Sequence, residues 1–318
     1  MFHHHVAPFG KYQKHTIENT QTGDCLCLVP QRGACVLQLT LGGQNILDGY
    51  HEPHELELLA WSKNIVLFPF PNRLKDGKYT FDGVDYQYPI NNAATQNAIH
   101  GHGKDVEMQV KNVFTDSDSA SITCRYQNEG QDNPFPFPHS FEVTFSLLKP
   151  HHLRVKMSLR NDGHTAMPAG LGWHPYVSLT DDVADLTLQM PACERIEIDQ
   201  RMLPTGTKTT YTAFAQPTKI GNTVLDNGFF IAQNEAKQAE ISLVAPQGTL
   251  HYWQQMGVGK FNFVQIFTPP HRTCIALEPM TCNIDAFNSG DGLVVLLPTE
   301  CLEATFGMGW EPTPNAVE

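Results

Sequence analysis

The sequence contains few basic residues, no long hydrophobic run and no sustained helical repeat. Among 318 residues, 21 Lys and Arg stand against 33 Asp and Glu, which gives a formal net charge of −12. Nucleic acids and anionic membranes are bound through clustered Lys and Arg, so neither is an expected partner. No apolar run approaches the ~18 to 20 residues of a spanning helix, and residues 1–15 hold no apolar stretch of signal-peptide length. We therefore expect a cytoplasmic protein.

The eight cysteines include no CxxC pair. In a long chain without an export signal, reduced thiols that serve as small hydrophobic side chains are the better interpretation. We therefore expect free thiols.

Period-two hydrophobic patterning dominates the chain and predicts β-strands. The clearest segments are CVLQLTL (35–41), YTFDGVDYQY (79–88), EMQVKNVF (107–114), ASITCRY (120–126), FEVTFSLL (141–148) and HLRVKMSL (152–159). FDGV (81–84) is typical of a tight hairpin. So many strands must pair into sheets that cover one another, which predicts an all-β sandwich or barrel.

No linker divides the sequence, since Ser/Gly-rich and charged tethers are both missing. We therefore predict a single domain over residues 20–311, an N-terminal extension over residues 1–19 and a C-terminal tail over residues 312–318.

A carboxylate stands at the end of an apolar strand in the stretch CIALEPMTC (274–282). A buried, unpaired carboxylate is costly, so it is normally hydrogen-bonded, paired or protonated. In an extended strand Glu278 shares a face with the small residues Cys274 and Ala276, which leaves space on that face. We interpret Glu278 as facing a cavity for a polar ligand, and the alternative is a structural Glu held in an ion pair.

Two further polar side chains lie close to a proline in the sequence. Arg73 lies in FPFPNRLKDGKY (68–79). Its planar guanidinium suits two parallel hydrogen bonds to hydroxyl or carboxylate oxygens, and the alternative is that it caps a loop carbonyl. His174 lies between Trp173 and Pro175. Aromatic residues at a rigid edge suit a stacked sugar ring, and a core histidine with one hydrogen bond is the alternative.

His100 and His102 lie two residues apart in NAIHGHG (97–103), and Glu107 follows. On a strand the two histidines would share a face, as in the metal motif of cupins, H-x-H followed by Glu. The glycines that flank that motif are missing here, so a metal site is the weaker interpretation. Glycines around His100 would instead let a ligand or another backbone approach closely.

Two histidines, a carboxylate and an arginine are the groups that acid–base chemistry on a hydroxylated molecule requires. No GxSxG, P-loop or dinucleotide fingerprint occurs. The residues alone therefore predict an all-β protein with a polar acid–base pocket.

Three blocks of the sequence resemble the aldose 1-epimerase (galactose mutarotase) family in order and spacing. PNRLKDGKYTFDGVDYQYPINNAATQNAIHGHG (71–103) is similar to its N-R … H-G-G block, GWHPYVSL (172–179) to its HPYF block, and LEPMTCNIDAFNSGDGLVVLLP (277–298) to its E-P-M-T … L-x-P-G block. The resemblance implies a large antiparallel β-supersandwich of the galactose mutarotase type. It also implies interconversion of the α and β anomers of a free aldose without a cofactor.

The resemblance further implies roles for five residues. Glu278 matches the general base that takes the proton of the C1 hydroxyl, and His174 matches the general acid that protonates the ring oxygen. Arg73 and His100 match residues that hydrogen-bond sugar oxygens. Asp226 resembles an aspartate that binds sugar hydroxyls.

The chain departs from the family pattern where His102 replaces the second glycine of H-G-G and where L-P-T-E replaces L-P-G-E at 297–300. The altered H-G-H-G site motivates one alternative, a sugar-binding protein of the same fold without turnover. Related branches of the family act on hexose 6-phosphates, which gives a mutarotase of those sugars as the other alternative. The acidic charge balance disfavours a phosphorylated substrate. A glycosidase would need two facing carboxylates, of which this sequence identifies Glu278 alone.

Overall fold

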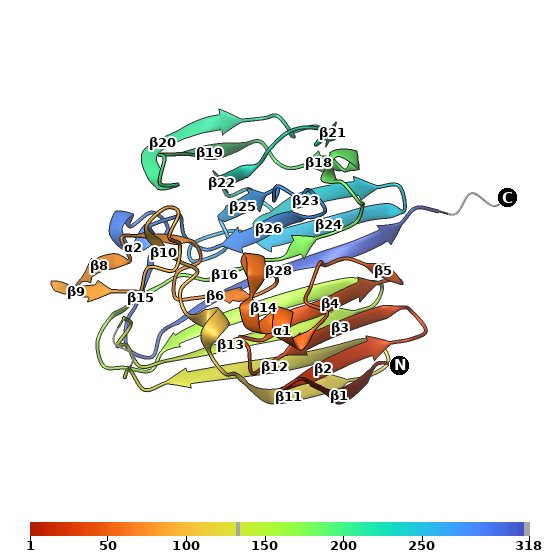
Figure 1. Ribbon diagram of the computed structural model, residues 1–318, viewed down its shortest axis with the longest axis horizontal. Coiled ribbons are helices and arrows are strands. Elements are labelled where there is room, and N and C mark those ends of the chain that lie inside the picture. The colour runs from red at the N-terminus through yellow and green to blue at the C-terminus, as the bar shows by residue number, and fades with distance from the viewer. Residues whose placement is uncertain (132–133, 315–318) are drawn as a thin grey trace.

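The computed structural model describes residues 1–131 and 134–314, and its three large sheets are antiparallel (Figure 1). This confirms the all-β prediction. Helical structure in these residues consists of α1 (Pro53–Leu58), α2 (Ala286–Ser289) and the 3-10 turns η1 (Ala60–Ser62), η2 (Gly103–Asp105) and η3 (Val183–Asp185).

The N-terminal part of the chain folds into a five-stranded meander in sequence order. Its strands are β1 (His3–Phe9), β2 (Tyr12–Asn19), β3 (Asp24–Val29), β4 (Cys35–Leu41) and β5 (Gln44–Asn45). Residues 1–19, for which the sequence predicted an extension, form β1 and β2, and β2 pairs with β3. The start of the domain at residue 20 stays a prediction, but the sheet continues on its N-terminal side.

The largest sheet has nine strands in the order β11-β12-β13-β14-β28-β24-β23-β18-β21. They are β11 (Gln109–Thr115), β12 (Ser119–Asn128), β13 (His139–Leu148), β14 (His152–Asn161), β28 (Cys301–Pro312), β24 (Gly248–Gln255), β23 (Gln238–Ala245), β18 (Thr187–Gln189) and β21 (Thr218–Lys219). The last strand of the chain, β28, lies between β14 and β24 and joins the two halves of the sheet.

An eight-stranded sheet in the order β20-β19-β22-β25-β26-β16-β6, with β17 also paired to β26, carries the pocket described below. Its strands are β20 (Pro204–Tyr211), β19 (Cys193–Ile198), β22 (Asp226–Phe230), β25 (Phe263–Phe267), β26 (Ile275–Met280), β16 (Gly172–Trp173), β17 (Tyr176–Val177) and β6 (Val66–Leu67).

Three small two-stranded sheets complete the fold. They are β7 (Arg73–Lys75) with β10 (Asn97–Ile99), β8 (Lys78–Phe81) with β9 (Val84–Gln87), and β15 (Met167–Ala169) with β27 (Val294–Leu296). The predicted FDGV hairpin connects β8 and β9. Asp82 and Gly83 have φ values of 50° and 74°, as the mirror-image hairpin turn requires.

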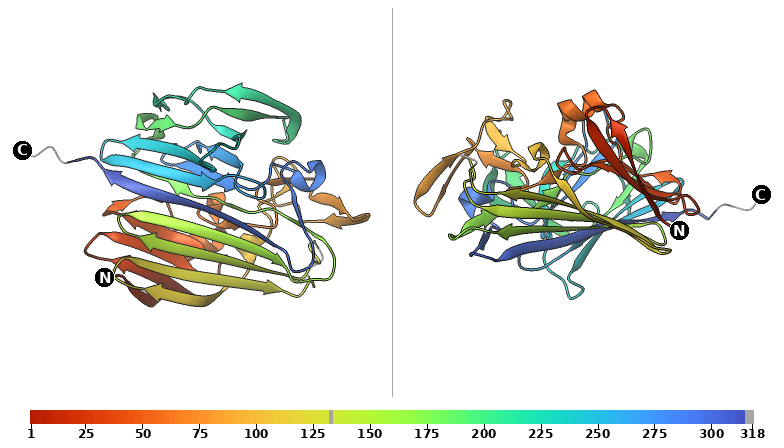
Figure 2. Two further views of the ribbon diagram at one scale, coloured as in Figure 1. Left: turned by 180° about the vertical axis from the view of Figure 1, so that it is seen from behind. Right: turned by 90° about the horizontal axis from the view of Figure 1, so that it is seen from below.

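The nine-stranded sheet forms one long layer, and the other large sheets lie against it (Figure 2). Phe68, next to β6, stacks on Phe141 of β13 with ring centroids 4.1 Å apart. Trp173 of β16 packs against Phe306 of β28 at 5.3 Å. The apolar faces of the layers thus form one continuous core, as expected for a β-supersandwich.

The C-terminal tail predicted over residues 312–318 begins where β28 ends, at Pro312. Thr313 still donates its backbone N–H to the Gln247 carbonyl, and residues 315–318 lie outside the described residues. Among the residues that the structure describes, no helix is long and apolar enough to cross a membrane.

Candidate active site

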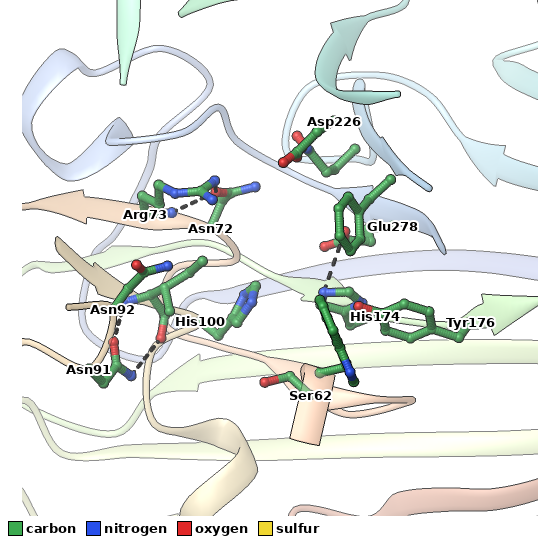
Figure 3. Close-up of a pocket in the computed structure, with 14 residues that line it drawn as sticks. Ser62, Asn72, Arg73, Asn91, Asn92, His100, His174, Tyr176, Asp226 and Glu278 are labelled. Atoms are coloured by element: carbon green, nitrogen blue, oxygen red, sulfur yellow. Dashed lines mark hydrogen bonds and ion pairs between the residues drawn. The ribbon is translucent and has the colours of Figure 1, made fainter. Parts of the chain in front are cut away.

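A polar pocket of about 310 Å³ opens above the eight-stranded sheet. All five residues that the sequence singled out line it, namely Arg73, His100, His174, Asp226 and Glu278 (Figure 3). They come from β7, β22, β26 and two connecting segments, so five distant parts of the sequence meet in one cavity.

Sheet register explains why Glu278 faces the pocket. Glu278 of β26 lies directly opposite Gln265 of β25, and Asp226 of β22 lies opposite Phe267. Because side chains alternate along a strand, these residues all project from the same face. The small residue Ala276 occupies that face too, and the ring of Tyr176 packs over it. The sequence predicted open space along the whole face that carries Cys274, Ala276 and Glu278. Because Tyr176 covers Ala276, the cavity is open only at Glu278.

Glu278 is almost fully enclosed, with 2 % of its surface exposed. Its Oε1 lies 3.5 Å from His174 Nε2, and its Oε2 has no hydrogen-bond partner among the described residues. Burial raises the pKa of Glu278 well above its usual value; Asp226 raises that pKa further, while Arg73 opposes the shift. An enclosed carboxylate with a free oxygen is a strong acceptor for a hydroxyl proton.

His174 lies in the short link between β16 and β17, and its backbone is held on both sides. Its N–H donates to the Ile65 carbonyl at 3.0 Å, and its carbonyl accepts from the Asn64 N–H at 2.8 Å. The imidazole stacks on Tyr176 at 4.8 Å. Burial lowers the pKa of His174 well below its usual value, with smaller contributions from His100 and Arg73.

Asn64 ties together the segments around His174. Its carbonyl accepts from Trp173 Nε1 at 3.1 Å, its Oδ1 accepts from the Tyr176 N–H at 3.0 Å, and its Nδ2 donates to the Asp48 carbonyl at 2.9 Å. Its φ of 56° lies in the left-handed region, which asparagine tolerates better than most residues. The buried Asn64 therefore fixes the backbone on both sides of the imidazole.

His100 and Arg73 form another wall of the pocket (Figure 3). His100 Nδ1 lies 3.0 Å from the Pro71 carbonyl, which can only accept, so Nδ1 carries the proton and Nε2 of the neutral ring is an acceptor. Burial lowers the pKa of His100 to about 4. A Cβ at Gly101 would meet the Phe68 carbonyl oxygen at 2.1 Å, so this turn needs glycine.

The Arg73 guanidinium leaves donors available for a ligand. Its Nη1 donates to Asn72 Oδ1 at 3.3 Å, the same oxygen that accepts the Arg73 backbone N–H at 2.8 Å. Its Nε is buried without a hydrogen-bond partner among the described residues. Because buried donors are normally satisfied, such a group suits a polar ligand.

Gln265 is a pocket residue that the sequence analysis missed. Its Nε2 donates to Asp226 Oδ1 at 2.9 Å, and its Oε1 is buried without a partner among the described residues. Burial raises the pKa of Asp226, while Arg73 and the Gln265 hydrogen bond lower it. Gln265 is a polar residue within the apolar run FVQIF, just as Glu278 is a polar residue within an apolar strand. The pairing of β25 with β26, which the sequence does not show, places Gln265 beside Glu278.

The aromatic surface for a stacked sugar ring, which the sequence suggested beside His174, lies elsewhere in the pocket. Tyr176 is only 1 % exposed, because its ring lies between His174 and the apolar residues of β26. The accessible aromatic surface comes from Trp61, on η1, and from Phe267. Nothing in the sequence connected Trp61 with this site, since it lies in a turn before the first recognised block.

The metal hypothesis for His100, His102 and Glu107 is wrong. His102 turns away from the pocket and contacts the Tyr88 hydroxyl through Nδ1 at 3.1 Å. Its ring packs against Phe68 in the core. Over residues 1–131 and 134–314, no group of three His, Cys, Asp or Glu side chains could hold a metal ion. The positive φ of His100 and Gly101 explains the error, because the segment is a turn in which the two rings point apart.

Comparisons with known proteins identify the family of this chain. The family model of aldose 1-epimerase matches residues 14–309. The uncharacterized protein YihR of Escherichia coli K12 is 30 % identical over 283 residues, which cover 86 % of this chain and 86 % of YihR.

Two solved structures share the fold across almost their whole length. A galactose mutarotase-like protein from Clostridium acetobutylicum superimposes with a TM-score of 0.86 at 18 % identity, covering 98 % of this chain and 99 % of the other. The galactose 1-epimerase of Lactobacillus acidophilus gives a TM-score of 0.82 at 17 % identity and covers 99 % of both chains. The fold is therefore of the galactose mutarotase type, and the chain belongs to the aldose 1-epimerase family.

Proposed function

We propose that this protein is a mutarotase that interconverts the α and β anomers of a free aldose. The observation that carries the proposal is the pair of Glu278 and His174, buried together at 3.5 Å in a pocket whose other lining residues are mostly polar. Anomer exchange requires one group that removes a proton and another that supplies one, close together and shielded from bulk water.

The proposed reaction moves two protons and breaks one carbon–oxygen bond. The Glu278 carboxylate takes the proton of the C1 hydroxyl while His174, as an imidazolium, protonates the ring oxygen. The C1–ring-oxygen bond breaks, and the electrons of the former O–H bond form the aldehyde. After rotation about the C1–C2 bond, neutral His174 takes the proton of the C5 hydroxyl and Glu278 returns its proton to the aldehyde oxygen as the ring closes on the other face.

Burial favours this exchange because it acts on the two groups in opposite directions. The raised pKa of Glu278 and the lowered pKa of His174 both reduce the preference for the charged pair that the usual pKa values would give. The state with two neutral groups therefore becomes accessible beside the state with a carboxylate and an imidazolium. A reversible reaction uses both states, one for opening and one for closing the ring.

The charge of the pocket supports a neutral substrate. Among the described residues that line it, Arg73 is the one Lys or Arg, and the carboxyl groups of Asp226 and Glu278 offset its charge. A phosphate carries close to two negative charges at neutral pH and normally requires several basic groups or backbone donors. A free aldose is therefore favoured over a hexose 6-phosphate.

The alternative of a sugar-binding protein without turnover rested on His102, which replaces a glycine of the family pattern. His102 lies outside the pocket, so this replacement does not change the residues that line the pocket and no longer supports that alternative.

The cytoplasmic location and the single domain over residues 20–311 remain proposals from the sequence.

Polarimetry on freshly dissolved α-D-glucose and α-D-galactose tests the proposal. The protein is expected to accelerate the decay of optical rotation in a saturable manner with at least one free aldose. Glucose 6-phosphate is the matched comparison, and it should be exchanged much more slowly. Absence of acceleration with a panel of free aldoses would contradict the proposal, and release of nitrophenol from nitrophenyl glycosides would point to a glycosidase.

Asp226→Asn is expected to move the acidic limb of the kcat/KM profile to lower pH. Glu278 must be ionised to act as the base, so activity is lost as the pH falls through its pKa. Burial and the Asp226 charge raise that pKa, and removing the charge lowers it. In the variant, kcat/KM then persists to lower pH, although weaker sugar binding reduces its maximum value. The pH profile of Asp182→Asn, an exposed carboxylate, serves as control, and an unchanged or rising limb in Asp226→Asn would contradict the assignment.

A further inference from the structure

We propose that Trp61 is a specificity-determining residue, whose indole stacks on the C–H face of the aldose in its pyranose form. The inference rests on the proposed function, which it deepens by naming the ring form and the residue that selects it. Trp61 lies outside the three blocks that resemble the family, and it lines the same pocket as Glu278 and His174.

Trp61 is unusually exposed for a tryptophan. Its exposed fraction is 48 %, whereas Trp173 and Trp310 are 0 % and 4 % exposed. An indole on the wall of a polar pocket presents an apolar surface that water solvates poorly, so covering it is favourable. A ligand in this pocket would cover it.

Several residues around Trp61 have a left-handed backbone conformation, and one of them, Leu59, caps the C-terminus of helix α1. Leu59, Trp61, Ser62 and Asn64 all have φ values between 47° and 63°, in the left-handed region. Side chains with a Cβ rarely adopt this region, and such strain persists where the surrounding structure enforces it. Backbone strain of this kind gathers at ligand sites, although it does not by itself define one.

Hydrogen bonds and aromatic contacts enforce this geometry. The Tyr50 hydroxyl donates to the Ala60 carbonyl at 2.8 Å and accepts from the Lys63 N–H at 3.0 Å, which closes the turn on both sides of Trp61. The indole lies 6.2 Å from the Phe267 ring and contacts His271 edge-on at 5.6 Å. The indole is therefore placed before a ligand arrives, so little ordering is required on binding.

Most of the other residues that line the pocket are polar and do not match the apolar face of a pyranose ring. Arg73, His100, Asp226 and Gln265 all offer hydrogen-bonding groups, which suit hydroxyls on the rim of the sugar. The C–H groups of a pyranose ring form an apolar face, which hydrogen-bonding groups do not stabilise. Trp61 and Phe267 supply the flat apolar surface that matches it.

Steady-state polarimetry on Trp61→Ala and Trp61→Phe provides the first test. Trp61→Ala is expected to raise KM about tenfold, as the loss of one aromatic contact predicts, while kcat changes little. Trp61→Phe should recover most of the affinity. Leu58→Ala is the matched control, because Leu58 is 76 % exposed on the neighbouring helix and does not line the pocket.

Acrylamide quenching of tryptophan fluorescence provides a second test that does not depend on turnover. In Glu278→Gln, the aldose that the wild type turns over is expected to protect one accessible tryptophan from quenching. The protection should vanish in the double variant with Trp61→Phe. An unchanged KM in Trp61→Ala, or protection that persists without Trp61, would overturn this inference while polarimetry still supports the mutarotase. If the wild type neither binds nor turns over any aldose, the proposed function fails first.

Discussion

Glu278→Gln is expected to abolish anomer exchange while leaving the fold and sugar binding intact. The amide has nearly the shape of the carboxylate and can still accept a hydrogen bond, but it cannot take the proton of the C1 hydroxyl. Loss of one acid–base group typically reduces turnover by ~10² to 10⁴-fold. Polarimetry at saturating sugar measures the loss, with the uncatalysed rate as the baseline.

The same variant should reveal the cost of burying the carboxylate. Because the pKa of Glu278 is raised in the folded protein, the folded state holds this proton more tightly than the unfolded chain. Its contribution to stability is therefore greatest at low pH and declines as the pH rises past the unfolded value of about 4.3. Glu278→Gln removes this decline, so at neutral pH the variant should unfold at the same or a higher temperature than the wild type.

Glu240→Gln is the control for both measurements, because Glu240 is exposed on β23, in the nine-stranded sheet, and does not line the pocket. It should change neither the rate nor the pH dependence of the melting temperature. Retained turnover in Glu278→Gln would remove the base from the proposed mechanism. A large drop in melting temperature would instead show that Glu278 is a structural residue, the alternative left open by its sequence.

The sequence predicted the strands well where one face of a strand is buried and the other exposed. CVLQLTL became β4 with the predicted bounds, and HLRVKMSL falls within β14. In β14 the alternation of apolar and polar residues follows directly from a half-buried sheet, and in β4 it holds from Leu37 onward, because Val36 on the other face is buried as well. Short strands such as β6 and β17, each of two residues, carry no such periodicity. Their place in the sheet is set by long-range pairing.

The same physics explains which site residues could be found. Glu278 stood out because a carboxylate is costly in an apolar strand, and that signal is local. Gln265 and Trp61 gave weaker signals, since a neutral amide in a strand and an aromatic residue in a turn are both ordinary. Their proximity to Glu278 depends on the pairing of β25 with β26 and on the turn closed by Tyr50, neither of which is local.

Replacement of His174 by alanine is the second change with a large expected effect. His174 supplies the proton that lets the ring oxygen leave, so its loss should reduce kcat by ~10² to 10⁴-fold. KM should change less, because Arg73, His100 and Asp226 remain to bind hydroxyls. Polarimetry over a range of sugar concentrations separates the two parameters. His251→Ala, on the exposed side of β24, should behave as the wild type.

Chemical rescue distinguishes an acid from a structural residue. The space left by the missing ring lies against Tyr176, which stacks on His174 in the wild type, and can admit a free imidazole. Added imidazole should restore part of the turnover of His174→Ala, and the rescue should follow the imidazolium fraction as the pH changes. Imidazole should not rescue Glu278→Gln, because that variant still has its acid. Full activity in His174→Ala, or equal rescue of both variants, would contradict the assignment of His174 as the acid that faces the base Glu278.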